Sequence, residues 1–249
     1  MSDKIEKINS DITIRQHGRA LAFGTDAYLL SAYVKRGAGH VCELGAGSGV
    51  ITLLCAARGK IKDALCVEVQ KDIAELCRKN AEENGFSDRI SVAACDMRDR
   101  PREYDGTFDT VVTNPPYMRV TSGKPNDDKA NFACRHELFG DIGDFCRTAA
   151  RLLKFGGLFY AVYRPDRLSE LCAACENAGL SVKVMTLVYP TEDHVPSAVL
   201  IRAKKGASGG MKTTKPLIIY ASKTEMTNDN YTEDMKYIYE NGDFNDCFR

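Results

Sequence analysis

The sequence predicts an α/β fold in which a mostly parallel, doubly wound sheet carries helices on both faces. Short apolar runs typical of buried strands alternate with helical patterns between residues 26 and 203. Parallel strands need such crossover helices, which bury both faces of the sheet. The last two strand-like runs have no helix between them, so we expect the final strand to be antiparallel. A chain of 249 residues with 44% hydrophobic residues is long enough to bury this core.

Seven strands are expected, because seven short apolar runs end in turn-forming sequence. They are residues 40–44, 63–69, 89–95, 108–113, 158–163, 181–188 and 195–202. Helices are expected at residues 27–36, 49–58, 71–83, 142–153 and 167–178, and several of them close on glycine, which is a helix-stop signal. One domain is expected, with a cap segment (1–38), a core (39–203) and an extension (204–249). In the extension we expect a flexible basic linker at 204–216, a short strand or anchor at 217–220 and a helix at 231–239.

A glycine-rich loop follows the first strand and opens the first core helix. Its sequence at residues 43–49 is Glu-Leu-Gly-Ala-Gly-Ser-Gly, and its glycines permit a tight turn and the close approach of a ligand. A dinucleotide fingerprint has two residues before its last glycine, whereas this loop has one. Glu43 at the strand tip would repel a pyrophosphate and attract a cation. The loop therefore favours S-adenosylmethionine, which carries a sulfonium and an amino group.

Two further acids end the next two strands. Glu68 ends the second strand, where a carboxylate can accept hydrogen bonds from both ribose hydroxyls. Asp96 ends the third strand, where it could accept a hydrogen bond from the adenine amino group. Each acid alone is more typical of a solvated strand end. Three acids at the edge where α/β sheets bind ligands favour a bound adenosyl group.

The fourth strand is followed directly by Asn114, Pro115, Pro116 and Tyr117. In the simplest interpretation these residues only terminate the strand. Proline, however, cannot donate a hydrogen bond, the Asn side chain offers an oxygen acceptor, and the Tyr ring offers a stacking surface. Two acceptors that hold the hydrogens of a planar amine localise its lone pair on nitrogen. We therefore expect methyl transfer to an amino group, achieved by positioning and electrostatics.

These motifs resemble those of the class I methyltransferases of the N6-adenine type, which have a Rossmann-like fold. More closely, the chain resembles the bacterial tRNA1(Val) (adenine-N6)-methyltransferase family. The most discriminating segments are Phe-Gly-Thr-Asp-Ala at 23–27, Arg-His-Glu at 135–137 and Tyr-Thr at 231–232. The resemblance implies transfer of a methyl group from S-adenosylmethionine to the N6 amine of an adenine beside the anticodon of a valine tRNA. S-adenosylhomocysteine is then the product.

The resemblance also implies roles for particular residues. The catalytic segment would be Asn114, Pro115, Pro116 and Tyr117. The cofactor would be held by Phe23, Gly24, Thr25, Asp26, Glu43, Gly45, Gly47, Gly49, Glu68, Val69, Asp96, Met97 and Asn114. From the residues alone, Thr25 and Asp26 could equally cap the helix that follows them. His136 could orient the substrate or hold a loop, and the structural role is slightly favoured.

The charges balance at 34 basic and 34 acidic residues, which excludes nucleic-acid binding by bulk charge alone. The basic residues nevertheless cluster, while acids gather in residues 225–249. A charge run is usually only a solvated face. If the clusters do contact tRNA phosphates, the candidate residues are Arg119, Lys124, Arg135, Lys204, Lys205 and Lys212.

The ten cysteines mostly lie in apolar runs, where Cys packs as a small hydrophobe. The charged start lacks a signal-like apolar run, and no stretch approaches the ~18 apolar residues of a membrane span. We therefore expect a cytoplasmic protein with reduced thiols. Cys172 and Cys175 form a single C-x-x-C pair without further ligands, so we expect no metal site. A monomer is favoured.

Three other functions fit parts of the pattern. A protein-glutamine N5-methyltransferase acts on an amide with the same two hydrogens, although such enzymes usually carry a helical domain before the glycine loop, and here only 42 residues precede Glu43. A ribosomal RNA guanine-N2 methyltransferase would use the same site. A non-catalytic adenosyl-binding or RNA-binding module would not need so complete a site. A carbon-5 pyrimidine methyltransferase is excluded, because residues 114–117 contain no Cys nucleophile.

Overall fold

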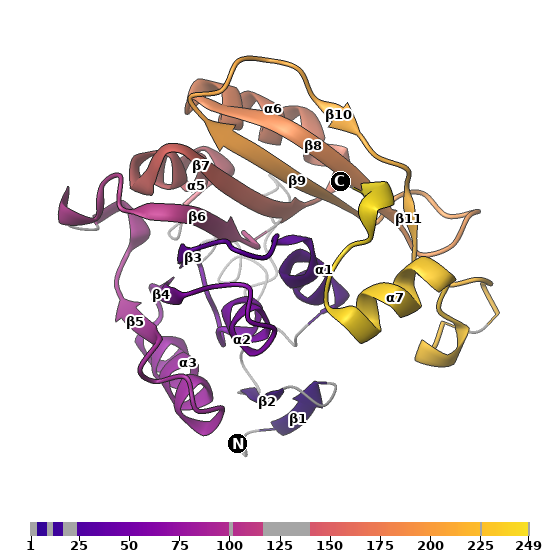
Figure 1. Cartoon of the computed structure of the whole chain (residues 1–249), viewed down its shortest axis with the longest axis horizontal. Helices are drawn as coiled ribbons and strands as arrows, with labels where there is room; N and C mark the ends of the chain where they lie inside the picture. Colours follow the sequence, from indigo (N-terminus) through magenta and orange to yellow (C-terminus); the bar gives the residue numbers. More distant parts are fainter. Residues whose placement is uncertain are drawn as a thin grey trace, which may run out of the picture.

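The computed structural model describes residues 4–8, 12–16, 24–99, 102–116, 140–224 and 226–248. Within them, the central sheet has nine strands in the order β10-β8-β9-β7-β6-β3-β4-β5, with β11 also paired to β8 (Figure 1). The strands are β3 (His40–Leu44), β4 (Asp63–Glu68), β5 (Ile90–Ala94), β6 (Phe108–Thr113), β7 (Leu153–Tyr163), β8 (Leu180–Tyr189), β9 (Ala198–Lys205), β10 (Lys212–Thr213) and β11 (Leu217–Ile218).

The strand directions match the sequence prediction. Strands β3 to β7 pair in parallel, whereas β9 lies between β7 and β8 and is antiparallel to both. The seven expected strands are present as β3 to β9, and the expected antiparallel last core strand is confirmed. The two short additions, β10 and β11, pair with the outer edge of β8.

Helices cover both faces of the sheet. They are α1 (Thr25–Tyr33), α2 (Val50–Ala57), α3 (Lys71–Glu83), α5 (Ile142–Leu152), α6 (Leu168–Asn177) and α7 (Glu233–Asn241). In Figure 1, α5 and α6 lie on one side of the sheet, and α1, α2 and α3 lie on the other. Each side has its own cluster of buried apolar side chains, so the sheet is packed from both directions as a parallel sheet requires.

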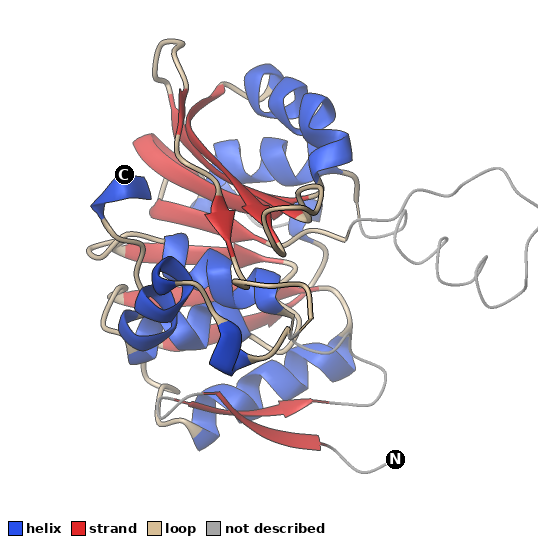
Figure 2. Ribbon diagram, turned by 90° about the vertical axis from the view of Figure 1, so that its right-hand side faces the viewer, coloured by secondary structure: helices blue, strands red, loops and turns tan. Residues whose placement is uncertain are grey.

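An N-terminal hairpin is a feature that the sequence pattern did not indicate. Strands β1 (Lys4–Ile8) and β2 (Ile12–Gln16) pair with each other and lie beside α3 (Figures 1 and 2). Asn80 in α3 and Asn84, the C-cap residue of that helix, bind the backbone of β2 as a neighbouring strand would. Asn80 accepts from the Arg15 N–H at 2.8 Å, and Asn84 accepts from the Thr13 N–H at 2.9 Å. These bonds give partners to backbone N–H groups of β2 that would otherwise have no hydrogen bond.

The C-terminal extension is more ordered than expected. The expectation of a flexible linker at 204–216 is wrong in part, because Lys204 and Lys205 end β9 and residues 212–213 form β10. The open edge of β8 explains this order, since it offers N–H and C=O groups that the extension pairs. Helix α7 begins after Thr232, whose side chain caps the Met235 N–H. The expected helix at 231–239 is therefore confirmed with a shift of two residues.

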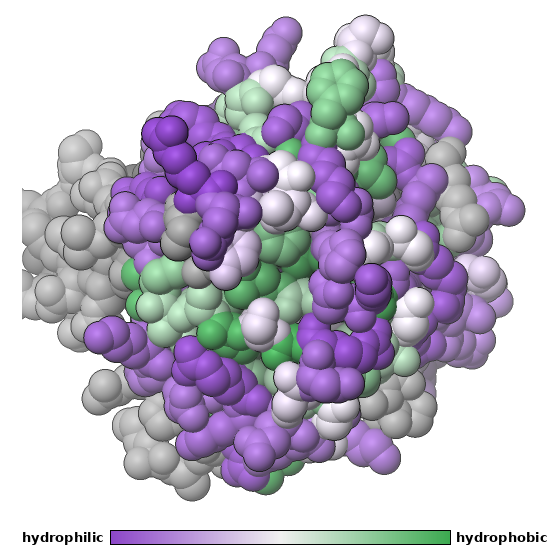
Figure 3. Space-filling model, turned by 60° about the vertical axis from the view of Figure 1, so that its left-hand side comes forward, coloured by the Kyte–Doolittle hydropathy of each residue, from purple (hydrophilic) through white to green (hydrophobic). Residues whose placement is uncertain are grey.

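One side of the molecule carries an exposed apolar area. Figure 3 brings forward the side with β5 and β6 and shows this area framed by polar side chains. Ala93 and Cys95, at the end of edge strand β5, are only partly buried and pack against the cluster that includes α5. Among the described residues, no helix has the length and apolar character needed to cross a membrane.

Candidate functional site

The candidate site lies where the parallel strands end. Leu44 at the end of β3 is in register with Thr113 of β6 and with Val67 of β4. Glu68 of β4 is in turn in register with Ala94 of β5. The segments that follow these four strands therefore share one edge of the sheet, which is the edge where α/β sheets bind ligands.

The glycine loop is held on the end of the neighbouring strand. The N–H groups of Gly45 and Ala46 both donate to the Val67 carbonyl, at 2.9 and 3.0 Å. Gly49 has φ of +81°, and a Cβ there would lie 2.5 Å from the Cys77 sulfur. Gly47 also has positive φ, but a Cβ there would meet nothing within 4 Å. The last glycine is thus required by packing, whereas Gly47 borders open space that a ligand can enter.

Glu43 points into the protein rather than to the surface. It is 1% exposed, and its Oε2 accepts hydrogen bonds from the Thr52 N–H at 3.0 Å and from the Thr52 hydroxyl. Thr52 lies in the first turn of α2, so Glu43 accepts from a backbone N–H that has no partner within that helix. Burial raises the pKa of Glu43 to about 7, against the lowering effect of the Thr52 hydrogen bonds.

Glu68 ties the end of β4 to the glycine loop. Its Oε2 accepts from the Gly47 N–H at 3.0 Å, and its Oε1 accepts from the Gln70 N–H at 3.0 Å. The adjacent Val69 is partly buried. Gln70 Nε2 also donates to Oε1 of Glu68, at 3.3 Å. An ionised carboxylate has about four acceptor positions, so Glu68 can keep these three bonds and still accept a hydrogen bond from a hydroxyl group.

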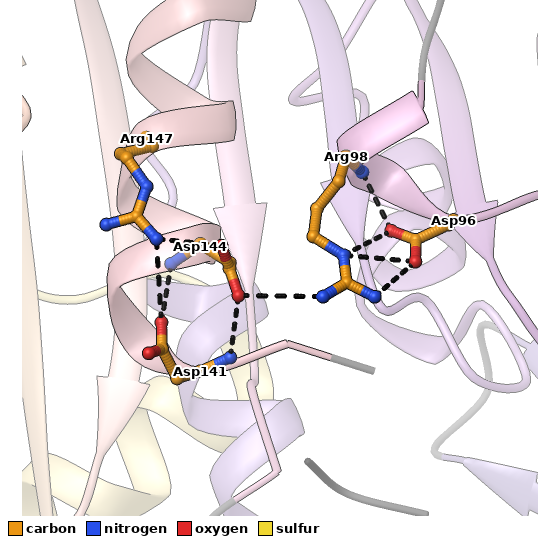
Figure 4. A network of polar contacts seen from close by, with 5 residues as sticks. All are labelled: Asp96, Arg98, Asp141, Asp144 and Arg147. Carbon is orange, nitrogen blue, oxygen red and sulfur yellow. Dashed lines mark hydrogen bonds and ion pairs between the residues drawn. The ribbon is translucent and has the colours of Figure 1, made fainter. Parts of the chain in front are cut away.

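Asp96 follows β5 and belongs to a network of charges that reaches α5 (Figure 4). Arg98 donates to both of its carboxylate oxygens, and this hydrogen bonding holds the pKa of Asp96 below its ordinary value. Met97, between them, is buried. The sequence predicts Asp96 and Met97 at the cofactor site, but it does not single out Arg98 as the partner of Asp96. The Asp-Met-Arg motif itself contained the signal, because an arginine two residues after an acid can fold back onto it.

The amine-binding turn is anchored at its start. Thr113 is fully buried and donates its hydroxyl to the Leu44 carbonyl at 2.8 Å, which joins β6 to β3 just before the turn. Asn114 is partly buried and Pro115 is buried. Tyr117 lies outside the described residues. The described part of the turn therefore begins beside the glycine loop, as expected for residues after adjacent parallel strands.

A pocket of about 410 Å³ opens between the start of α1 and the end of β7. Its lining comes from α1, from the end of β7 with the turn after it, and from the loop before β9, and comprises Asp26, Tyr163, Arg164, Pro165, Asp166, Val195, Pro196 and Ser197. Because β7 is parallel to β6, the pocket is at the same edge as Asn114. Burial raises the pKa of Asp26 above its ordinary value.

The start of α1 differs from one interpretation of the sequence. The N-cap residue is Gly24, and no side chain caps the helix, so capping by Thr25 or Asp26 is wrong. Instead, Asp26 contributes to the pocket. Phe23, which the resemblance also assigns to the cofactor, lies outside the described residues.

The candidate RNA-binding lysines lie away from Asn114. Strand β9 is antiparallel, so Lys204 pairs with Leu158 near the beginning of the parallel strands rather than at their ends. Lys205 donates to the Leu153 carbonyl at 2.7 Å, and Lys212 pairs with Val184 in the middle of β8. Arg119, Lys124 and Arg135, with His136, lie outside the described residues. The structure therefore does not bring the described lysines together with the turn after β6.

The described cysteines are free thiols. Cys175 lies 3.7 Å from the sulfur of Cys146, in the core between α5 and α6. Among the residues that the structure describes, no group of three or more His, Cys, Asp or Glu side chains is arranged to hold a metal ion.

Known proteins are similar to this chain in sequence. The sequence model of the methyltransferase small domain matches residues 19–167. The chain belongs to this methyltransferase family. A tRNA1(Val) (adenine(37)-N6)-methyltransferase from Trichodesmium erythraeum is 32% identical over 196 residues, covering 78% of this chain and 81% of that protein. One from Dyadobacter fermentans is 26% identical over 229 residues, covering 91% of this chain and 94% of that protein.

Solved structures agree on the fold. The crystal structure of a predicted O-methyltransferase from Agrobacterium tumefaciens has a TM-score of 0.70 and 26% identity, covering 88% of this chain and 98% of that one. Pyrococcus horikoshii TYW2 in complex with MeSAdo has a TM-score of 0.59 and 15% identity, covering 82% of this chain and 72% of that one. The predicted class I methyltransferase fold and the predicted family are therefore confirmed.

Proposed function

We propose that this methyltransferase transfers a methyl group from S-adenosylmethionine to the N6 amine of an adenine beside the anticodon of a valine tRNA. The observation that carries the proposal is the position of Asn114 and Pro115, directly after β6 and one strand away from the glycine loop. The names of the relatives from Trichodesmium erythraeum and Dyadobacter fermentans agree with it. We further propose that the chain acts as one domain, as a monomer, in the cytoplasm.

The residues at the strand ends fit an adenosyl group. Glu68 is fixed by three N–H donors and can accept a hydrogen bond from a ribose hydroxyl. Gly47 leaves open space beside it, and Asp96 offers a carboxylate one strand further along. Gly45, Gly49, Val69 and Met97 would complete the walls. When bound, S-adenosylmethionine supplies an electrophilic methyl group.

Asn114 and its neighbours supply acceptors for the target amine. The Asn side-chain oxygen and a backbone carbonyl of the turn would each accept one N–H of the adenine, which orients the nitrogen and localises its lone pair. The pocket beside Asp26 and Tyr163 is large enough to take a base that has left its stack. Tyr117, for which stacking is expected, would close the turn over that base.

The test uses cofactor with a labelled methyl group and separate pools of tRNA, ribosomal RNA and release factor. Label should enter tRNA, and a tRNA transcript with guanine in place of the adenine beside the anticodon should take up none. Label in release factor would instead indicate a glutamine methyltransferase, and label in ribosomal RNA alone would indicate a guanine methyltransferase. Either result would overturn the proposed substrate.

The Asn114→Ala variant tests the mechanism. We expect turnover to fall at least ~100-fold, while calorimetric affinity for S-adenosylhomocysteine stays within about threefold. Asn241→Ala is a matched control, because Asn241 is exposed at the end of α7 and bonds only within that helix. Near-normal turnover of Asn114→Ala would refute the amine-holding role. Failure of the native protein to bind S-adenosylhomocysteine would indicate a non-catalytic module.

A further inference from the structure

Arg98 forms a fork around the carboxylate that ends β5. Its backbone N–H donates to Oδ1 of Asp96 at 2.9 Å. Its Nε lies 3.0 Å from both oxygens, and its Nη2 lies 2.5 Å from Oδ2. The two residues are close in sequence, but the contact depends on the short η1 helix (Met97–Asp99), which turns the chain back on itself (Figure 4). Asp96 thus has a defined orientation set by Arg98.

The fork holds Asp96 as a hydrogen-bond acceptor in one orientation. The backbone N–H and Nε of Arg98 are within hydrogen-bond distance of Oδ1, and Nε and Nη2 are within hydrogen-bond distance of Oδ2. The same contacts hold the pKa of Asp96 low, so the group stays an acceptor only. The side chain of Asp96 is 21% exposed, so a ligand N–H can approach it. Such a group can accept from an N–H donor and cannot donate to a carbonyl.

The guanidinium is itself held from the other side by α5. Nη1 of Arg98 lies 3.9 Å from Oδ2 of Asp144, and Asp144 and Asp141 form the capping box of that helix (Figure 4). The backbone beneath is also fixed. Buried Met97 packs so closely on Gly140 that a Cβ there would lie 2.9 Å from the Met97 methyl. Arg98 is therefore restrained on both sides of the ion pair.

Helix α5 extends this restraint to the glycine loop. Its Phe145 ring is 3.4 Å from where a Cβ on Gly45 would lie. The turn after β5 and the loop after β3, which would contact opposite ends of an adenosyl ligand, are thus both packed against one helix. A change at Arg98 can therefore act on the adenine end specifically or on the whole site, and these two outcomes can be measured separately.

We propose that Arg98 is a positioning residue that makes the cofactor site selective for an exocyclic amine at the 6-position of the purine, by holding the carboxylate of Asp96 in one orientation as a hydrogen-bond acceptor. This inference rests on the proposed use of an adenosyl cofactor. It assigns to Arg98 no contact with the substrate. A 6-oxo purine presents a carbonyl oxygen at the same position, so it meets the fixed carboxylate with repulsion.

The test compares two ligands by titration calorimetry: S-adenosylhomocysteine and its 6-oxo analogue, S-inosylhomocysteine. A hydrogen bond to a charged group corresponds to roughly tenfold to hundredfold in affinity, so the native protein should prefer the amine by about that factor. In Arg98→Gln the preference should fall at least fivefold, with weaker binding of S-adenosylhomocysteine and little change for the analogue. Arg98→Lys keeps the charge without the fork and should fall between the two.

The matched control is Arg147→Gln, which removes the contacts of Arg147 with Asp144 and Asp141 and leaves the Asp96–Arg98 pair intact. Its ligand preference should equal that of the native protein. If the Arg98 variants lose affinity for both ligands equally, Arg98 only supports the fold of the site. If the affinities for both ligands stay unchanged, Arg98 neither supports the fold of the site nor sets its selectivity. Both results overturn the inference. Absence of any binding by the native protein would instead refute the proposed cofactor.

Discussion

Glu43 should make the stability of this protein depend on pH in a direction opposite to that of most carboxylates. The side chain is 1% exposed. Burial raises its pKa from the ordinary 4.5 to about 7, the Thr52 hydrogen bonds oppose the increase, and the charge of Glu68 adds to it. The folded protein therefore holds a proton between these values that the unfolded chain releases. Its stability should fall as the pH rises from about 4.5 through about 7.

The magnitude follows from the difference between the two pKa values. At ~1.4 kcal/mol per pKa unit, ionisation of Glu43 above pH 7 costs about 3 kcal/mol of folding free energy. Glu43→Gln removes the charge and keeps an oxygen that can accept from the Thr52 N–H. The advantage of the Gln variant over the native protein should therefore grow by about 2–3 kcal/mol between pH 5 and pH 8.

Urea unfolding followed by circular dichroism at several pH values measures this difference. Glu233→Gln serves as the control, because the Glu233 side chain is 92% exposed and its substitution should have almost no pH-dependent effect. A constant difference between native and Glu43→Gln across the pH range would refute the reasoning. That result would mean that Glu43 is ionised throughout, with its charge balanced by the first turn of α2.

Two further substitutions test the packing that supports the site. Gly49→Ala should lower the free energy of unfolding by about 1–3 kcal/mol, because φ is +81° and the new Cβ would lie 2.5 Å from the Cys77 sulfur; an unchanged urea midpoint would contradict this. Lys60→Met should lower the free energy of unfolding by about 3 kcal/mol. The Lys60 side chain is 1% exposed, donates to three backbone carbonyls at the end of α1 and lies 3.8 Å from Asp243. The exposed Lys62→Met is its control, and equal effects of the two would refute the burial argument.

The core of the fold was predictable because its signals are local. Each strand from β3 to β9 is a short apolar run, and each following helix has its own period and stop signal, so their order alone indicates a parallel sheet. The hairpin of β1 and β2 was not predictable in this way. It is held by Asn80 in α3 and by Asn84 at the end of that helix, about 65 to 71 residues away in sequence. These side chains bind the backbone of β2, and a hydrophobic pattern in the sequence carries no information on such bonds.

The site was predictable to the extent that it depends on strand ends. Glu68 and Asp96 follow successive parallel strands, so their common edge could be inferred from the sequence alone. The orientation of Glu43 could not, because a strand-tip acid can face either a ligand or the helix that follows. Thr52 in the first turn of α2 decides between them. Similarly, Arg98 satisfies Asp96 through a backbone turn whose shape the residue order does not state.

The placement of the basic residues changes how a neutral chain can recognise RNA. An antiparallel β9 carries Lys204 and Lys205 to the edge opposite Asn114. At the edge with Asn114, Arg98 is paired with Asp96, and Arg164 is paired with Asp166. Such pairs have little charge left to attract phosphates over a distance. Arg119, Lys124 and Arg135 lie outside the described residues. Within the described part of this edge, the features that can select a target adenine are the shape of the pocket beside Asp26 and the acceptors of the turn after β6.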